Sequence, residues 1–267
     1  MTMNLKMVAT TMVALTFACN TQAQSHVLQV NTKKTVAPIQ STMYGLFFED
    51  INYAADGGLY GELVKNRSFE FPQPLMGWQT FGHVTVENDG PFERCPHYVT
   101  LAYPGHRERR SGLVNEGYFG IGVLKGEDYR FSVWAKAPNG EARIKVQLID
   151  EGTLEERQDF ATAHIDINSN GWKRYEVKIH SPKTDNKARL RIFLEGQQPV
   201  SLEHISLFPV NTFRKRTNGM RRDLGQALAD IHPGVFRFPG GCIVEGEALA
   251  NRYQWKNTIG PVENRPL

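Results

Sequence analysis

Polar side chains follow two short apolar runs that lie far apart in the sequence. Gly45 to Phe48 leads directly to Glu49, and Val235-Phe236 leads to Arg237 and then to a Gly-rich turn. A strand of an α/β barrel delivers polar groups to the barrel mouth in this way, at its carboxyl end. A carboxylate accepts hydrogen bonds from hydroxyl groups, and a guanidinium orients a neighbouring carboxylate through two parallel bonds. The two motifs therefore predict a pocket that reads a hydroxyl-rich ligand.

The turn after Arg237 adds a third candidate. Pro239-Gly240-Gly241 bends the chain sharply, so Cys242 and the nearby backbone N–H groups can approach a ligand closely. The residues alone also permit a structural interpretation, in which Glu49-Asp50 is a solvated strand end, Arg237 a structural ion pair and Cys242 a small buried hydrophobe. Two further acids, Asp56 and Glu62, either face the same site or mark helix entries near Gly57-Gly58, and we expect the second.

A strand, a helix and a second strand must position these residues. Met43 to Phe48 is apolar on both faces, which predicts a buried parallel strand. The second strand is expected at Val235 to Phe238, just after the helix. The helix is predicted from a shared apolar face, with Thr217 or Asn218 as its cap and Pro233-Gly234 as its end; that face comprises Met220, Leu224, Leu228 and Ile231. The order predicts a βαβ unit that brings the two motifs together.

A second domain is predicted inside this unit. From Gly77 to Pro209 the apolar residues recur every second position, and Asn139-Gly140, Asn170-Gly171 and Glu195-Gly196 mark turns. Seven or eight short strands with this spacing predict an antiparallel β-sandwich of the jelly-roll type. The strands are expected around 118–123, 129–135, 144–148, 164–167, 175–179, 190–194 and 202–207, and a further short strand pair is expected at Val27–Val30 and Lys34–Ala37.

The N-terminus predicts export. Lys6 and the apolar stretch from Met7 to Ala18 are typical of a signal peptide, and Thr21-Gln22-Ala23 offers a cleavage site before Gln24. The mature chain is then periplasmic or extracellular, with no membrane attachment. The alternative is a lipoprotein anchored at Cys19.

The bulk composition excludes several classes of function. The chain has 267 residues, 40% of them hydrophobic, with a net charge of only +3 from interspersed charges, so nothing favours nucleic acid binding. Cys95 and Cys242, the two cysteines outside the leader, form neither a disulfide framework nor a metal spacing. We expect no metal and no other cofactor, because no metal-binding or nucleotide-binding motif is present.

The two motifs closely resemble the opening of the catalytic barrel in the α-L-arabinofuranosidases of glycoside hydrolase family 51. The similarity covers Gly45 to Asn52 and Val235 to Cys242, and it continues through Arg221 to Leu224 and Tyr253 to Pro261. The resemblance implies a (β/α)8 barrel interrupted by an inserted carbohydrate-binding-like sandwich. The expected segments are a signal peptide at 1–23, N-terminal strands and the first barrel strand at 24–76, the jelly roll at 77–209, and the first barrel helix with the second strand at 210–267.

The resemblance also implies roles for single residues. Glu49 and Arg237 match residues of the arabinose subsite, and Cys242 matches a position that touches the sugar, where many relatives carry Asn. The family's nucleophile and acid/base are glutamates at the fourth and seventh barrel strands, which we expect beyond Leu267, so no catalytic residue is assigned in this chain. Asn115-Glu116 mimics the acid/base pair but falls among the sandwich strands.

The expected function follows from the resemblance. The chain would be the N-terminal part of a retaining enzyme that releases non-reducing-end α-L-arabinofuranose from arabinan or arabinoxylan, and it would be inactive alone. The alternative is a secreted, non-catalytic carbohydrate-binding protein. Three aromatic residues of the sandwich, Trp134, Trp172 and Tyr118, are available to stack on sugars, although strand aromatics are more often part of the core. The sequence leaves the oligomeric state and the particular polymer open.

Overall fold

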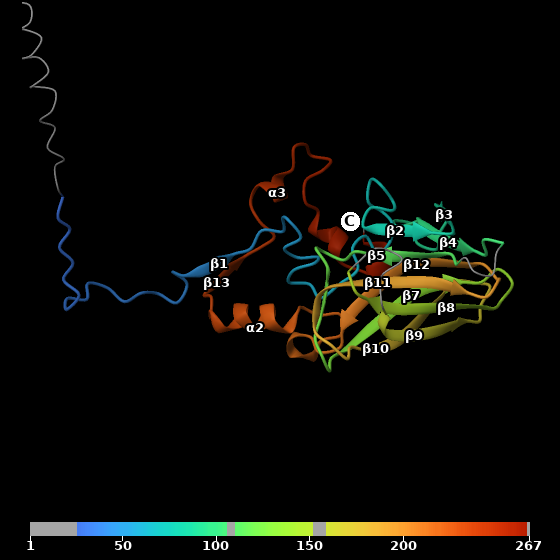
Figure 1. Ribbon diagram of the computed structural model, residues 1–267. Helices are drawn as coiled ribbons and strands as arrows, with labels where there is room; N and C mark the ends of the chain where they lie inside the picture. Colours follow the sequence, from blue (N-terminus) through green and yellow to red (C-terminus); the bar gives the residue numbers. More distant parts are fainter. Residues whose placement is uncertain (1–25, 106–109, 152–158, 266–267) are drawn as a thin grey trace, which may run out of the picture. The chain divides into compact units, whose positions relative to one another are not determined.

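The computed structural model describes residues 26–105, 110–151 and 159–265 (Figure 1). The chain divides into two units, residues 1–40 and residues 41–267. The predicted signal peptide and Cys19 lie outside the described residues. Among the described ranges, every helix falls short of the length and apolar character that a bilayer crossing requires.

The described part of the first unit, residues 26–40, contains no strand or helix. The predicted strand pair at Val27–Val30 and Lys34–Ala37 is therefore wrong. Val27, Leu28 and Val36 are all strongly exposed. A lone two-stranded ribbon is marginal in water without an apolar surface to cover it, and this segment has none within its unit.

Two antiparallel sheets form the bulk of the second unit (Figure 1). One sheet has five strands in the order β10-β7-β12-β4-β3, and the other has six, in the order β2-β5-β11-β8-β9 with β6 paired to β11. Their bounds are β2 Trp78–Phe81, β3 His83–Glu87, β4 Tyr98–Ala102, β5 Gly112–Asn115, β6 Ile121–Val123, β7 Asp128–Lys136, β8 Ala142–Ile149, β9 Asp159–Ile167, β10 Lys173–His180, β11 Asp185–Glu195 and β12 Val200–Pro209.

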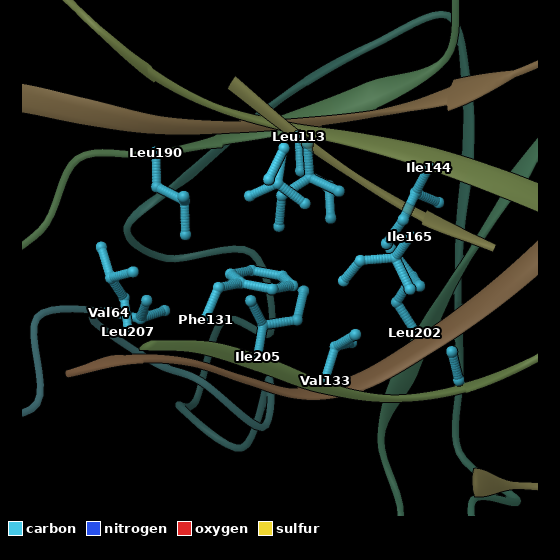
Figure 2. Close-up of a cluster of buried hydrophobic side chains, with 14 of the residues drawn as sticks. Val64, Leu113, Phe131, Val133, Ile144, Ile165, Leu190, Leu202, Ile205 and Leu207 are labelled. Atoms are coloured by element: carbon cyan, nitrogen blue, oxygen red, sulfur yellow. The ribbon is translucent and has the colours of Figure 1, made fainter. Parts of the chain in front are cut away.

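The core lies between the inner faces of the two sheets. Figure 2 shows Leu190, Leu113 and Ile144 of one sheet pointing toward Phe131 and Ile205 of the other. These side chains are buried because alternate residues of each strand face the opposite sheet. The β-sandwich predicted from the alternation is confirmed.

The alternation located some strands and missed others. The strands expected around 129–135, 144–148, 164–167, 175–179, 190–194 and 202–207 are present as β7 to β12. The strand expected at 118–123 begins only at Ile121, because Gly117 and Gly120 form a bridge across a tight turn. The first four sandwich strands, β2 to β5, were not predicted, although Val84 and Val86 of β3 do alternate with polar residues.

The predicted strand–helix–strand order is present around the sandwich. The strands are β1 (Gly45–Phe47) and β13 (Val235–Arg237), which pair in parallel, and the helix is α2 (Arg222–Asp230). The prediction of a buried first strand is wrong, because β1 and β13 are largely exposed. Their sheet has only two strands, so both strands are edges within the described part of the chain.

The predicted helix cap is also wrong. Arg221 occupies the cap position of α2 and makes no side-chain cap bond. Thr217 and Asn218 lie in the turn before it, and the Asn218 amide oxygen accepts a hydrogen bond from Arg130 instead. Met220, which was placed on the apolar helix face, bridges to Tyr60 before the helix begins. Tertiary pairing of this turn with residues 59–60 therefore delays the helix start.

The remaining helices are short. They are η1 (Phe213–Lys215), α3 (Cys242–Glu245), η2 (Trp255–Thr258) and η3 (Val262–Asn264). The last of them brings the chain back to the sandwich, where Glu263 accepts from the Trp134 indole at 3.2 Å. In the same region the Asn264 side chain accepts from the Arg94 backbone N–H at 3.4 Å.

Candidate functional site

The carboxyl ends of β1 and β13 lie side by side, as the sequence predicts. Phe47 is opposite Arg237 in the register, and the ladder continues past both strands. The Phe48 backbone N–H donates to the Arg237 carbonyl at 2.9 Å, and the Asp50 N–H donates to the Pro239 carbonyl at 2.8 Å. The polar groups of both motifs are therefore presented at one edge of the sheet.

The Glu49 carboxylate holds the Gly-rich turn. Its Oε1 accepts from the Gly241 N–H at 3.1 Å and from the Ile243 N–H at 3.5 Å. Gly240 precedes both residues and has φ 148°, and a Cβ there would come within 2.6 Å of Glu49 Cγ. Only glycine permits this approach. Both bonds use Oε1, which leaves Oε2 available for a donor from a ligand.

Arg237 lies on the same face as Glu49. Its guanidinium carbon is 4.7 Å from the centre of the Phe47 ring, a cation–π contact. Glu49 follows Phe47 by two residues, and side chains two apart share a face of an extended chain. The structural interpretation of Arg237 as an ion pair is wrong, because among the described residues no carboxylate lies within ion-pair distance of it.

Cys242 is the first residue of α3, and its free thiol is exposed. The interpretation of Cys242 as a small buried hydrophobe is therefore wrong, and that description fits Cys95 instead. Cys95 is buried under the sandwich, where burial raises the pKa of its thiol to about 11. Cys242 thus lies next to the Glu49-bound turn with its sulfur accessible.

The acidic residues near the site have structural roles, either in the loop after Glu49 or in the sandwich. Asp50 Oδ1 accepts from the Ala55 N–H at 3.1 Å and closes the loop after Glu49. The pKa of Asp56 is raised, chiefly by burial, with the opposing charge of Arg67 acting against that. The predicted helix-entry roles of Asp56 and Glu62 are wrong, because the structure forms no helix between Glu49 and Gly77.

Glu62 is instead a buried anchor of the sandwich. Its carboxylate accepts from the Ser206 hydroxyl at 2.6 Å and from the Leu207 N–H at 2.9 Å, both on β12. Arg67 lies 3.7 Å away and offsets part of the cost of burying the charge. Burial nevertheless raises the pKa of Glu62. Glu62 therefore fastens the segment after the first motif to the sandwich and does not face the site.

Sequence reasoning missed two aromatic residues at the site. Phe47 supports the Arg237 guanidinium, and the alternation of Phe47 with Glu49 was a usable signal for it. Tyr253 hydrogen-bonds through its backbone N–H to the Val244 carbonyl at 3.1 Å. Burial raises the pKa of the Tyr253 hydroxyl, and the nearby charges of Asp50 and Asp56 act in the same direction. Tyr253 begins one of the segments that carry the family resemblance, but no pattern in the sequence assigned it a role at the site.

The three aromatic residues proposed for sugar stacking are occupied within the chain. Trp134 packs edge-on against Phe92 and bonds to Glu263. Trp172 packs against Tyr98, and the Lys136 ammonium lies 4.8 Å from its ring centre. Tyr118 packs against Tyr53. These contacts favour the structural role that we expected for strand aromatics.

The remaining chemical features are structural. Asn115 is buried at the end of β5, where its amide bonds the backbone of Lys65, and Glu116 pairs with the Lys65 ammonium at 3.0 Å. Asn115-Glu116 thus acts as part of the sandwich. Among the described residues, no cluster of three or more His, Cys, Asp or Glu side chains has the geometry to hold a metal ion.

Family comparison first defines the class of the sandwich. A family model described as a carbohydrate binding domain matches residues 61–200, and one described as an alpha-L-arabinofuranosidase 1 domain matches residues 227–267. The first match covers more than half of the chain. The sandwich is therefore a member of the carbohydrate-binding domains, set beside a segment of a hydrolase domain.

Relatives then identify the family of the whole chain. An extracellular exo-alpha-L-arabinofuranosidase of Streptomyces chartreusis is 41% identical over 251 residues, covering 86% of this chain and 29% of the relative. Alpha-L-arabinofuranosidase 1 of Arabidopsis thaliana is 34% identical, covering 86% of this chain and 35% of the relative. The solved structure of arabinose-bound MgGH51 α-L-arabinofuranosidase matches with a TM-score of 0.78 and 30% identity, over 88% of this chain and 40% of that one.

The homologues that match this chain over most of its length are α-L-arabinofuranosidases, and the matching solved structure belongs to glycoside hydrolase family 51. The chain spans about a third of the length of the curated relatives it matches.

Proposed function

We propose that this chain is the N-terminal part of an enzyme that releases non-reducing-end α-L-arabinofuranose from arabinan- or arabinoxylan-type polysaccharides. The observation that carries the proposal is the shared face of Glu49 and Arg237 at the paired ends of two parallel strands. The 41% identity to the Streptomyces exo-alpha-L-arabinofuranosidase supports the reaction class.

Each residue of the site has a distinct role in this proposal. Glu49 uses Oε1 to fix the 240–243 turn and Oε2 to accept a hydrogen bond from a sugar hydroxyl. Arg237, held against Phe47, orients a carboxylate beside the sugar. Cys242 contacts the sugar from the turn that Glu49 fixes. A pocket of this kind binds well because its groups are fixed before the ligand arrives.

We further propose that β1, α2 and β13 are the first βαβ unit of a (β/α)8 barrel and that the sandwich is a jelly roll inserted after β1. The parallel pairing of β1 with β13 supports this, because parallel strands need a crossover connection. The exposed apolar side chains of both strands are of the kind that neighbouring barrel strands and helices cover.

Catalysis in this proposal needs a pair of carboxyl groups that the described site does not bring together. A retaining glycosidase uses two carboxyl groups about 5–5.5 Å apart, one as nucleophile and one as acid/base. The site described above contains one candidate sugar ligand of this type, Glu49, and one oxygen of its carboxylate is committed to the turn. We therefore expect residues 24–267 alone to bind sugar weakly and to hydrolyse nothing.

We also propose that the protein is exported from the cytoplasm. The Streptomyces relative is named extracellular, and residues 1–23 have the pattern of a leader, so the mature protein would be periplasmic or extracellular. Mass spectrometry of the exported protein tests this. A mature start near Gln24 is expected, an intact Met1 would reject export, and a lipid-modified Cys19 would replace the soluble form by a lipoprotein.

A non-catalytic carbohydrate-binding protein is the alternative function, and the family match of residues 61–200 favours it. Expression of the complete reading frame that contains this chain separates the two. Release of arabinose from an aryl α-L-arabinofuranoside by that protein, with none by the 267-residue chain, supports the enzyme. Binding of polysaccharide without turnover by either protein supports the alternative.

A further inference from the structure

Phe119 is presented to solvent by an unusual turn of the sandwich. Its side chain is 80% exposed, and its backbone has φ 62°, in the left-handed region that bulky residues avoid. Gly117 and Gly120 form a bridge across the turn, and the Lys187 ammonium donates to the Phe119 carbonyl at 3.1 Å. The turn is therefore fixed, and folding gains almost nothing from burying the ring.

A second aromatic residue with the same backbone conformation lies beside it. Tyr53 has φ 61° and is 37% exposed, and its ring centre is 6.1 Å from that of Phe119 at an interplanar angle of 71°. Tyr118 supports the pair from within the same turn, with its ring 5.2 Å from that of Tyr53. The Lys65 ammonium lies 5.3 Å from the Tyr53 ring centre. Strained backbone at two touching, exposed aromatics favours a functional role over a structural one.

The aromatic pair is connected to the candidate sugar site along the chain. Tyr53 belongs to the loop that starts at Glu49 and is closed by the Asp50–Ala55 hydrogen bond. The sandwich contributes Phe119 to this loop through a turn that is distant in sequence. Tyr53 thus lies four residues after Glu49, within the loop that follows the candidate sugar ligand.

We propose that Tyr53 and Phe119 form a stacking platform for a sugar ring of the polysaccharide that carries the arabinose. The proposal rests on the proposed function and extends it from the released sugar to the polymer. The apolar face of a sugar ring packs on an aromatic face, and such a contact needs an exposed ring in a fixed orientation. The platform would be a binding site separate from the outer faces of the sandwich sheets, where Trp134 and Trp172 are occupied within the chain.

Affinity electrophoresis of the 267-residue chain in gels containing soluble arabinoxylan or arabinan tests the platform. We expect retardation of the unmodified chain, a roughly tenfold weaker affinity for Phe119→Ala, and retained binding for Phe119→Trp. Leu124→Ala is the matched control, because Leu124 is also exposed on the sandwich, and we expect it to bind normally. Phe119→Gly should lose affinity while its Tm rises, because glycine removes the left-handed strain.

Two outcomes would overturn the platform. The first is equal retardation of the unmodified chain and Phe119→Ala, or no retardation of either. The second is a dimer in sedimentation that Phe119→Ala disperses, since the aromatic pair would then bind a second copy of the chain. Turnover of an aryl α-L-arabinofuranoside by the complete protein is independent of both outcomes, so the platform can fail while the proposed function stands.

Discussion

Large apolar side chains are buried in the sandwich but largely exposed in the β1–β13 strand pair. In the sandwich, Phe131 and Leu190 have no exposed surface, whereas in the strand pair Phe47 is 54% and Phe236 is 45% exposed. Each sandwich strand needs one covered face, and the opposite sheet covers it. A strand that is apolar on both faces needs cover on both sides, and a two-stranded sheet provides neither. The sandwich strands are thus covered within the described chain, whereas β1 and β13 are not.

Polar groups also differ between the two regions: they are buried in the sandwich and accessible at the strand pair. In the sandwich, buried charges serve the fold, as the Glu62 bonds to β12 show. In the strand pair, Glu49, Arg237 and Cys242 are at least partly accessible, and one oxygen of Glu49 is left for a ligand. Polar groups that converge on rigid strand ends and remain accessible are typical of a binding site.

The largest expected contrast is in stability. Leu190→Ala should lower the free energy of unfolding by about 3 kcal/mol, because it removes fully buried methyl groups and leaves a cavity. Phe236→Ala should cost less than about 1 kcal/mol, since much of that ring is exposed. Guanidinium unfolding followed by tryptophan fluorescence measures both, and equal losses would contradict the division between the two regions.

The labelling rates of the two cysteines should also distinguish the sandwich from the strand pair. Burial raises the pKa of Cys95 to about 11, so at pH 8 only about one thiol in a thousand is the reactive thiolate. We expect a maleimide to label Cys242 at least about a hundredfold faster than Cys95 in the folded chain. Peptide mapping by mass spectrometry reads each site separately. Rapid labelling of Cys95 would show that the sandwich opens in that region.

Part of the fold could be predicted from the alternation of apolar residues and from the order of the elements. Strands β7 to β12 were predictable because their apolar residues alternate. In contrast, β5 is buried at all four positions and shows no period. The alternation of Val84 and Val86 in the short strand β3 was a usable signal that was missed. The approach of the two motifs was predictable from the strand–helix–strand order. The bonds from Glu49 to residues 241 and 243 were not, because they depend on the path of the turn.

The contact between Tyr53 and Phe119 was missed because both residues have positive φ angles. Tyr53 and Phe119 adopt left-handed conformations that no local pattern announces, since such angles are rare outside glycine. Their contact also joins a loop of the first motif to a turn of the sandwich. A pairing of that kind follows only from the complete fold.

A further stability effect concerns pH. Glu203 and His204 are buried on β12, and within the part of the chain that the structure describes neither side chain meets a partner at hydrogen-bond geometry. Burial raises the pKa of Glu203 to about 9 and lowers the pKa of His204 to about 3. Above about pH 4.5 only the unfolded chain ionises Glu203, so stability falls as pH rises toward 9. Below about pH 6.5 only the unfolded chain protonates His204, so stability falls as pH drops toward 3.

Stability should therefore be greatest between about pH 4.5 and 6.5. Glu203→Gln should remove much of the decline on the alkaline side and gain about 1–2 kcal/mol near pH 8. His204→Asn should reduce the decline on the acid side, and asparagine tolerates the positive φ at this position. Thermal unfolding from pH 4 to 9 provides the curves. Unchanged slopes in both variants would mean that neither group titrates as its burial implies.

The central claim is that the paired ends of β1 and β13 form a sugar pocket with Glu49 as a ligand. Its most direct test is the release of L-arabinose from an aryl α-L-arabinofuranoside by the complete protein, measured for the unmodified form and for Glu49→Gln. Glu245→Gln is the matched control, because it makes the same change at an exposed position of the adjacent helix α3. We expect Glu49→Gln to lower kcat/KM by about 10- to 100-fold, as loss of a charged hydrogen bond implies, with Tm nearly unchanged. Full activity of Glu49→Gln would contradict the account, and Glu49 would then serve only to hold its turn.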